Sequence, residues 1–296
     1  MIRVSIGQTS RLNVYNKKID LRHGVRSEVG KLHAHKQAPS EDDFTCECPL
    51  REQYDTALFC VFDGHAGRGA AEKARTMLPA EMAAQLEGLD EKGLQAVRRK
   101  GLHAKKWREV FLRTDKALGA EYEGCTATAL LVHQDPGGKA VYLQAGNVGD
   151  SSCIVGNARG HEELTCDHRL SDRRERARLA AAGVKLRDGE DRLYGLSLSR
   201  ALGDQLLKNE DVGLTAEPHV SKVVQVVPGL GPQYAILASD GLWDHVNKGK
   251  VMQIAEEVGQ QSDQQPEAIA AALIERAQFQ RSTDDISVVV VVLSTR

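Results

Sequence analysis

The sequence lacks a long hydrophobic run. Its longest apolar stretch near the C-terminus, 286–293 (ISVVVVVL), is far shorter than the roughly 20 residues that cross a bilayer. The stretch is rich in β-branched valine and therefore predicts a buried strand. The first residues show no apolar signal segment and no glycine at position 2 for myristoylation. We therefore expect no membrane partner and a cytoplasmic or nuclear location.

An excess of either charge is also lacking. The 39 Lys and Arg residues and 41 Asp and Glu residues give a formal net charge of -2, without a long run of one sign. This balance argues against a nucleic-acid partner and against a polybasic membrane anchor. With 296 residues, of which 41% are hydrophobic, the chain can bury one large core. We interpret residues 1–296 as one globular domain and expect a monomer.

The six cysteines do not form the pattern of a disulfide framework. Cys60, Cys125 and Cys153 stand in apolar or small-residue stretches and are predicted to be core residues of a protein in a reducing compartment. Cys46 and Cys48 form a C-x-C pair, a pattern that can supply half of a metal site. Because no second such pair completes it, we favour a structural role for both.

Hydrophobic periodicity predicts a protein with many strands. Strands are expected over 56–62, 126–133, 140–149, 151–156, 220–227, 234–239 and 286–293. Helices are expected over 67–88, 94–122, 171–183, 250–259 and 265–279. This order lacks the strict strand–helix alternation of a parallel sheet and favours antiparallel sheets covered by helices. Between about 183 and 220 the pattern weakens, which predicts a surface flap subdomain.

Acidic residues stand at the ends of several predicted strands. They occur in Asp63-Gly64, Gly149-Asp150, Asp240-Gly241, SEDD (40–43) and STDD (282–285). One Asp-Gly pair is normally a turn signal, but so many carboxylates at strand ends suggest a cluster. Two carboxylates about 4 Å apart repel by roughly 4 kcal/mol at an effective dielectric near 20, so a cluster needs protons or cations. Oxygen ligands of this kind suit Mg²⁺ or Mn²⁺.

A series of motifs carries a family resemblance. In order they are SEDD, VFDGHAG, GCTATALL, AGNVGDSS, DHRLSDRRERARLAAAG, LSLSRALGD, EPHV, LASDGLWD and STDDISVVVV. Each is weak alone, but together and in this order they resemble the metal-dependent serine/threonine protein phosphatases of type 2C, from about residue 35 to the C-terminus. The resemblance implies an α+β fold, a β-sandwich of two antiparallel sheets flanked by helix pairs in four αββα layers, with the metals at one edge.

The resemblance also implies the ligands of two Mg²⁺ or Mn²⁺ ions. They are Asp63 as the bridging ligand, Gly64 through its carbonyl, Asp240 and Asp284 as direct carboxylates, and Glu41 and Asp42 on the second ion, largely through water. Gly64 has no side chain that would keep its backbone from a metal. Asp150 and Asp244, together with Asp240, match the weaker third-metal site of some family members.

His65 matches the general acid of the family. In the implied reaction, a metal-bridging hydroxide attacks the phosphorus of phosphoserine or phosphothreonine in a protein substrate, and His65 protonates the leaving oxygen. The alternative is a catalytically weakened member that acts as a binding or regulatory protein. The retained acidic set and His65 favour the enzyme.

One departure from the family motivates that alternative. The family usually has an arginine four residues before the glutamate of its acidic pair, where it grips the substrate phosphate; this sequence has Gln37. Lys36 is adjacent, but in an extended segment its side chain would face the opposite side from Gln37. The metal ligands are thus implied by the family motifs, whereas the binding of phosphate by Gln37 or Lys36 is not.

Three further positions are interpreted as structural. Asp285 stands where the family usually has Asn, and we favour a residue that solvates a turn. Asp204 and the pair Asp167-His168 are predicted to be local hydrogen-bonding anchors rather than ligands.

Overall fold

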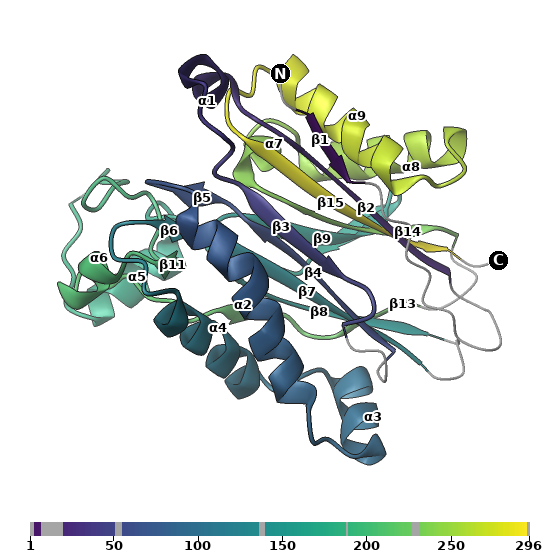
Figure 1. The fold of residues 1–296 in the computed structure, drawn as a ribbon, viewed down its shortest axis with the longest axis horizontal. Coiled ribbons are helices and arrows are strands. Elements are labelled where there is room, and N and C mark those ends of the chain that lie inside the picture. The colour runs from purple at the N-terminus through teal and green to yellow at the C-terminus, as the bar shows by residue number, and fades with distance from the viewer. Residues whose placement is uncertain are drawn as a thin grey trace.

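Two antiparallel sheets pack face to face in the computed structural model, which describes residues 3–6, 20–50, 55–135, 140–187, 189–226 and 231–294 (Figure 1). One sheet has, in spatial order, β1 (Arg3–Ile6), β2 (Asp20–Glu28), β15 (Ile286–Ser294), β14 (Gln233–Ala238), β9 (Ser152–Asn157) and β10 (Gly160–Glu163). The other has β12 (His219–Val220), β8 (Val141–Val148), β7 (Ala127–Gln134), β4 (Thr56–Phe62) and β3 (Asp43–Glu47), with β13 (Val224–Val226) beside β8. A small third sheet joins β11 (Leu202–Gly203), β6 (Gly124–Cys125) and β5 (Gly64–His65).

Helices cover the outer face of each large sheet (Figure 1). The sheet of β3 and β4 is covered by α2 (Gly69–Leu86) and α4 (Ala104–Leu118), and the shorter α3 (Glu91–Lys100) between them in the chain adds Leu94 to the same core. The sheet of β14 and β15 is covered by α7 (Asp240–Trp243), α8 (Lys248–Gln261) and α9 (Pro266–Phe279). This arrangement confirms the predicted α+β sandwich. Within the described residues, no helix is both long and apolar enough to span a bilayer.

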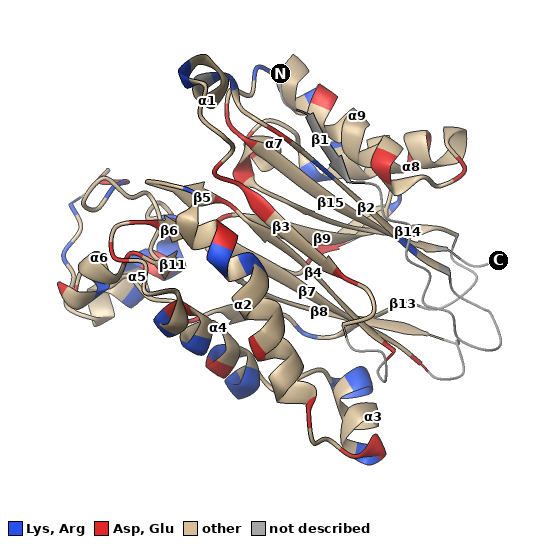
Figure 2. Ribbon diagram, in the orientation of Figure 1, with Lys and Arg blue, Asp and Glu red and all other residues tan. Residues whose placement is uncertain are grey.

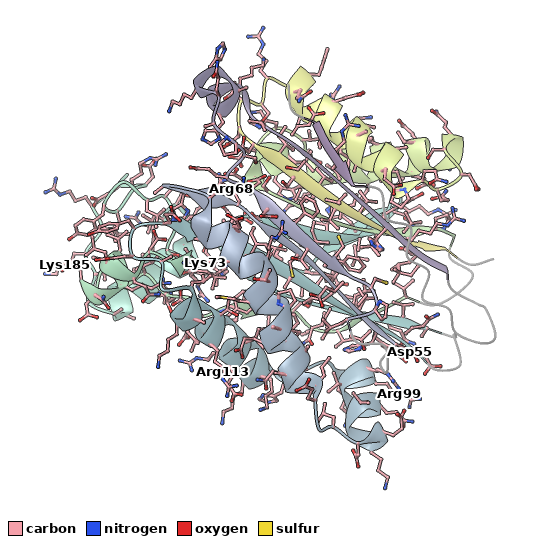
Figure 3. All side chains as sticks on the ribbon, in the orientation of Figure 1. Asp55, Arg68, Lys73, Arg99, Arg113 and Lys185 are labelled. Atoms are coloured by element: carbon pink, nitrogen blue, oxygen red, sulfur yellow. The ribbon has the colours of Figure 1, made fainter. Side chains whose placement is uncertain are left out.

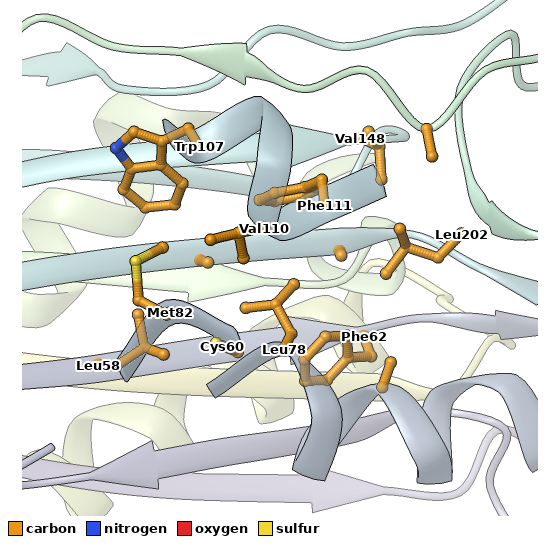
Figure 4. Packing of buried hydrophobic residues seen from close by; sticks show 14 of the residues in the cluster. Leu58, Cys60, Phe62, Leu78, Met82, Trp107, Val110, Phe111, Val148 and Leu202 are labelled. Carbon is orange, nitrogen blue, oxygen red and sulfur yellow. The ribbon is translucent and has the colours of Figure 1, made fainter. Parts of the chain in front are cut away.

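Strand β4 shows why so many strand residues are apolar. All seven of its residues are buried. Leu58, Cys60 and Phe62 face α2 and α4, where they pack with residues such as Trp107 (Figure 4), whereas the alternate residues Ala57, Phe59 and Val61 face the other sheet. Because successive side chains point to opposite faces, a strand covered on both faces must be apolar throughout.

The cysteines fit this core. Cys60 and Cys125 lie in the layer between helices and sheet, and Cys153 lies between the two sheets. All three are free and fully buried, as predicted. Cys46 and Cys48 lie at or next to β3 and pack against the layer between the sheets.

Two predicted elements are interrupted. The helix expected over 94–122 breaks at Gly101, whose φ of 80° is left-handed and where a Cβ would come within 2.6 Å of Gln144 Oε1. The strand expected over 220–227 is split into β12 and β13, both paired with β8, and residue 227 lies outside the described residues. Ser221 lies between these two strands, where its hydroxyl accepts a hydrogen bond from the Ala145 N–H. The split is a β-bulge, with one residue more on this chain than on β8.

The segment 183–220 contains only short elements among its described residues, namely β11, α6 (Gln205–Asn209) and β12. A buried carboxylate ties it to α5 (Arg173–Ala181). Glu175 accepts hydrogen bonds from Arg178 Nε at 2.8 Å, Ser199 Oγ at 2.7 Å and Arg200 Nη2 at 2.5 Å. Burial alone would raise the pKa of Glu175, but hydrogen bonds from Arg200, Arg178 and Ser199 outweigh it and lower that pKa to about 2.

We expect Glu175→Gln to lower the free energy of unfolding by about 3 kcal/mol at neutral pH, because it removes a buried charge that pairs with the half-buried guanidinium groups of Arg178 and Arg200. Since the pKa of Glu175 is depressed, its charge stabilises the wild-type fold fully above the ordinary value of 4.5, and this stabilisation is lost as the pH falls toward 2. Urea unfolding across this range measures both effects. A difference between wild type and variant that does not shrink on acidification would contradict the assignment.

Candidate active site

The acidic residues of the sequence motifs gather where both sheets end. In the second sheet, Asp43 at the start of β3 pairs with Phe62 at the end of β4, so the residues before β3 lie beside Asp63. In the first sheet, the end of β14 lies beside the start of β15. Ser239 Oγ, after β14, donates to Asp42 Oδ2 at 2.8 Å and joins the two sheets. Figure 2 shows acidic residues at the start of β3 and near α7.

The carboxylates are close enough to change one another's ionisation. Burial, followed by the charges of Asp42 and Asp240, raises the pKa of Asp63 well above its ordinary value. Burial and the charges of Asp150, Asp244 and other acids raise the pKa of Asp240 to about 8. Burial, with Asp285 as the largest neighbouring charge, raises the pKa of Asp42 to about 7. A cation that enters this region is therefore stabilised by several carboxylates at once.

Oxygen atoms are the ligands that hard dications prefer, and the carboxylates of this cluster carry such atoms. Close packing requires glycine at position 64, because a Cβ there would come within 2.5 Å of the Glu41 carbonyl oxygen. In the part of the chain that the structure describes, no group of three or more His, Cys, Asp or Glu side chains is spaced to hold a metal ion as it stands. Several of the oxygens accept hydrogen bonds from protein groups instead.

Asp285 is not a solvated turn residue, and that interpretation is wrong. Its side chain is 4% exposed. Its oxygens accept hydrogen bonds from Gly30 N at 2.6 Å, Glu41 N at 2.8 Å and His33 Nδ1 at 2.9 Å. Asp285 therefore fixes the backbone of the acidic pair against the start of β15. Asp284 beside it is exposed.

We expected the segment before the acidic pair Glu41-Asp42 to be extended, but it is helical. Lys36 ends helix α1 (Lys31–Lys36), and Gln37 caps it with a left-handed φ of 55°. Both residues are exposed. The prediction that the side chains of Lys36 and Gln37 face opposite sides of an extended segment is therefore wrong. Another cation, Arg68, lies at the amino-terminal end of α2 (Figure 3) with Nη2 3.9 Å from Asp43 Oδ2.

The imidazole ring of His65 contacts an acidic residue outside the cluster around Asp63, namely Asp204. His65 Nε2 lies 2.8 Å from Asp204 Oδ2, and Asp204 is almost fully buried. Asp204 N donates to the Glu123 carbonyl at 2.9 Å, which fixes its backbone. A Cβ on Gly124 would come within 2.4 Å of His65 Nε2 and 2.1 Å of Asp204 Oδ2, so the pair needs glycine at this position. The contact occupies Nε2 of His65 and fixes the orientation of its ring.

Arg169 contacts the three carboxylates predicted for a third metal. Its Nε lies 2.6 Å from Asp150 Oδ2, and its Nη2 lies 3.0 Å from Asp240 Oδ2 and 2.9 Å from Asp244 Oδ1. This role of Arg169 was not predicted from the sequence. The residues next to Arg169 in the motif DHRL do not point to its partners, because Asp150, Asp240 and Asp244 come from other parts of the chain. Asp167, in the same motif, accepts a hydrogen bond from Ser152 Oγ at 2.9 Å.

Comparison with known proteins gives consistent matches. The family model described as "Protein phosphatase 2C" matches residues 22–286. The chain is 35% identical over 298 residues to Protein phosphatase 2C 70 of Arabidopsis thaliana, covering 97% of this chain and 50% of that protein. It is 34% identical over 307 residues to a probable protein phosphatase of Dictyostelium discoideum, covering 96% of this chain and 31% of that protein. The chain thus spans half or less of these relatives.

A solved structure has a similar fold. The crystal structure of serine-threonine phosphatase 2C from Toxoplasma gondii superimposes with a TM-score of 0.71 at 22% sequence identity. The match covers 98% of this chain and 100% of that chain.

Proposed function

The chain belongs to the protein phosphatase 2C family, and on this premise we propose that it hydrolyses phosphoserine and phosphothreonine in proteins with the help of Mg²⁺ or Mn²⁺. The observation that carries the proposal is the cluster of acidic residues around Asp63, where burial and neighbouring carboxylates raise the pKa of Asp63 well above its ordinary value. A site that served only to bind a partner would not need so many mutually repelling carboxylates.

The residues that would hold the ions come from both sheets. They are Asp63, the Gly64 carbonyl, Asp240 and Asp284, with Glu41 and Asp42 on the second ion. When bound, the ions supply a nucleophile from water at neutral pH and neutralise charge on the phosphoryl group. Asp285 and Ser239 support this set by holding Glu41 N and Asp42 Oδ2, respectively.

His65 is proposed as the proton donor to the leaving serine or threonine oxygen. Its ring is oriented by Asp204 through Nε2, and Nδ1 would carry the transferred proton. Asp204 thus acts through His65 and is a positioning residue.

Phosphate release from a phosphothreonine peptide tests the proposal. We expect turnover that needs Mg²⁺ or Mn²⁺, stops on chelation and returns when the ion is restored. A folded, metal-loaded protein that binds the phosphopeptide without releasing phosphate would instead support the weakened member that acts as a binding or regulatory protein.

Gln37 provides a separate test of how the phosphate is held. We expect Gln37→Arg to strengthen phosphate binding by on the order of 1–2 kcal/mol, or roughly ten-fold, because a bidentate charged contact replaces a neutral amide. If the contact is equally strong in the ground and transition states, KM falls and kcat stays constant. Steady-state kinetics on the peptide measure both.

Ala34→Arg is the matched control, because it adds the same charge at an exposed position within α1, the helix that Gln37 caps. It should change KM much less than Gln37→Arg does. If Gln37→Arg changes neither KM nor kcat in the folded, metal-loaded protein, Gln37 does not face the phosphate. Lys36 or Arg68 would then be the next residues to exchange.

A further inference from the structure

The guanidinium group of Arg169 lies among the carboxylates of the acidic cluster. The backbone around Arg169 is held by hydrogen bonds, because Leu170 N donates to the Ser197 carbonyl at 2.8 Å and Asp172 N donates to the Arg169 carbonyl at 3.0 Å. Arg169 also forms an antiparallel bridge with Leu198. The side chain is 31% exposed, so most of it is enclosed by protein. An arginine does not lose its proton in a protein, and its charge is therefore permanent.

The carboxylates that Arg169 contacts differ in how tightly they are enclosed. Asp150 is only 5% exposed, whereas Asp244 is 46% exposed at the edge of the site. Nε and Nη2 of the guanidinium point at different carboxylates, which is the fork geometry that arginine uses to join oxygen ligands.

A dication at the same place would compete with this group. Mg²⁺ binds oxygen at about 2.0–2.1 Å in near-octahedral geometry and needs lone pairs directed at itself. Here Asp150 Oδ2 and Asp240 Oδ2 are directed at Arg169. A third dication would have to displace a tethered group of like charge from both oxygens. The residues at this position therefore do not fit a third metal.

We infer that the guanidinium of Arg169 is the third cation of this site, in the place where the family resemblance predicts a third dication. The inference rests on the proposed metal pair, with which it shares Asp240. Arg169 bonds to Oδ2 of Asp240, so that Oδ1 can serve the pair. The chain then binds two dications, and the positive charge that a weakly held third ion would bring is part of the polypeptide.

Counting bound Mn²⁺ tests this inference without reference to activity. Equilibrium dialysis followed by metal analysis is performed on the wild type, on Arg169→Met and on Arg174→Met. Arg174 is a matched control, because the same exchange removes a charge that pairs with Asp172 outside the cluster. We expect Arg169→Met to bind one more ion per chain than the wild type and Arg174→Met to bind the same number as the wild type.

Asp244→Asn gives a second test in the wild-type background. Because Asp244 bonds to Arg169 rather than to an ion, this exchange should not change the number of bound ions; combined with Arg169→Met, it should remove the additional ion. An additional ion in Arg169→Met, or an unchanged count in Asp244→Asn, supports the inference. Three ions in the wild type, a folded Arg169→Met without the extra ion, or loss of an ion in Asp244→Asn alone would overturn it.

The same data keep this inference separate from the proposed function. The number of ions in the wild type reports on the metal pair, and a value of zero would contradict that pair. The difference between Arg169→Met and the wild type reports on Arg169 alone. Circular dichroism and thermal unfolding establish that each variant is folded before its ions are counted.

Discussion

Exchange of Asp63 for asparagine is expected to reduce kcat/KM for a phosphothreonine peptide by at least about a thousand-fold, or on the order of 4 kcal/mol of transition-state stabilisation. Asp63 stands at the centre of the acidic cluster, and Asp42 and Asp240 are the largest neighbouring charges that act on it. Asparagine keeps the shape but removes the charge that would bridge the two ions. Peptide kinetics and Mn²⁺ titration measure the two losses.

The melting temperature of Asp63→Asn distinguishes loss of the metal site from loss of the fold. Without metal, the wild type must either keep Asp63 protonated or bear the repulsion of its neighbours, since burial and these charges raise the pKa of Asp63. Asp63→Asn relieves this repulsion, so we expect the metal-free variant to melt about 2–4 °C higher for each kcal/mol relieved. Added Mn²⁺ should stabilise the wild type and leave the variant almost unchanged.

Asp55→Asn is the matched control for Asp63→Asn. Asp55, labelled in Figure 3, precedes β4, and Asp63 follows β4, so the two residues lie at opposite ends of one strand. The control should keep both turnover and Mn²⁺ binding. Retention of metal-dependent turnover in Asp63→Asn would remove Asp63 from the bridging role.

The buried strands were predictable from the sequence, but β2 was not. Strands such as β4 consist of apolar residues because both of their faces are covered. β2 has the sequence DLRHGVRSE and pairs with β15 along all nine of its residues. Its Arg22 and His23 are nevertheless buried. Pairing with a central strand, rather than its own hydrophobicity, holds β2 in the sheet, and a single sequence does not show that pairing.

The candidate site was predictable to a similar degree. Acidic residues at strand ends meet at one end of a sandwich, so their assembly could be predicted from the strand positions and the family motifs. The partners of these residues could not. Asp204 reaches His65 across 139 positions of sequence, and Asp285 reaches Glu41 across 244. Such contacts depend on tertiary packing, which the local pattern around each residue does not contain.

Exchange of His65 for glutamine is expected to affect two substrates very differently. A serine or threonine alkoxide is a poor leaving group and needs a proton, whereas p-nitrophenolate leaves without one. If His65 donates that proton, kcat on the phosphopeptide should fall by roughly 10²–10⁴-fold, the range of general acid catalysis. On p-nitrophenyl phosphate it should fall less than about ten-fold. Stopped-assay kinetics on both substrates give the ratio.

The contact between His65 and Asp204 sharpens this test. Asp204→Asn keeps a side chain of the same size but weakens the hold on the ring, so it should show the same preference for p-nitrophenyl phosphate with a smaller loss on the peptide. His161→Gln, at an exposed position of β10, is the control and should change neither substrate. Mn²⁺ binding should be unchanged in all three variants, because none of these residues is a proposed ligand. Equal losses of His65→Gln on both substrates would mean that His65 acts before the leaving group departs, and the proton would then have to come from another donor.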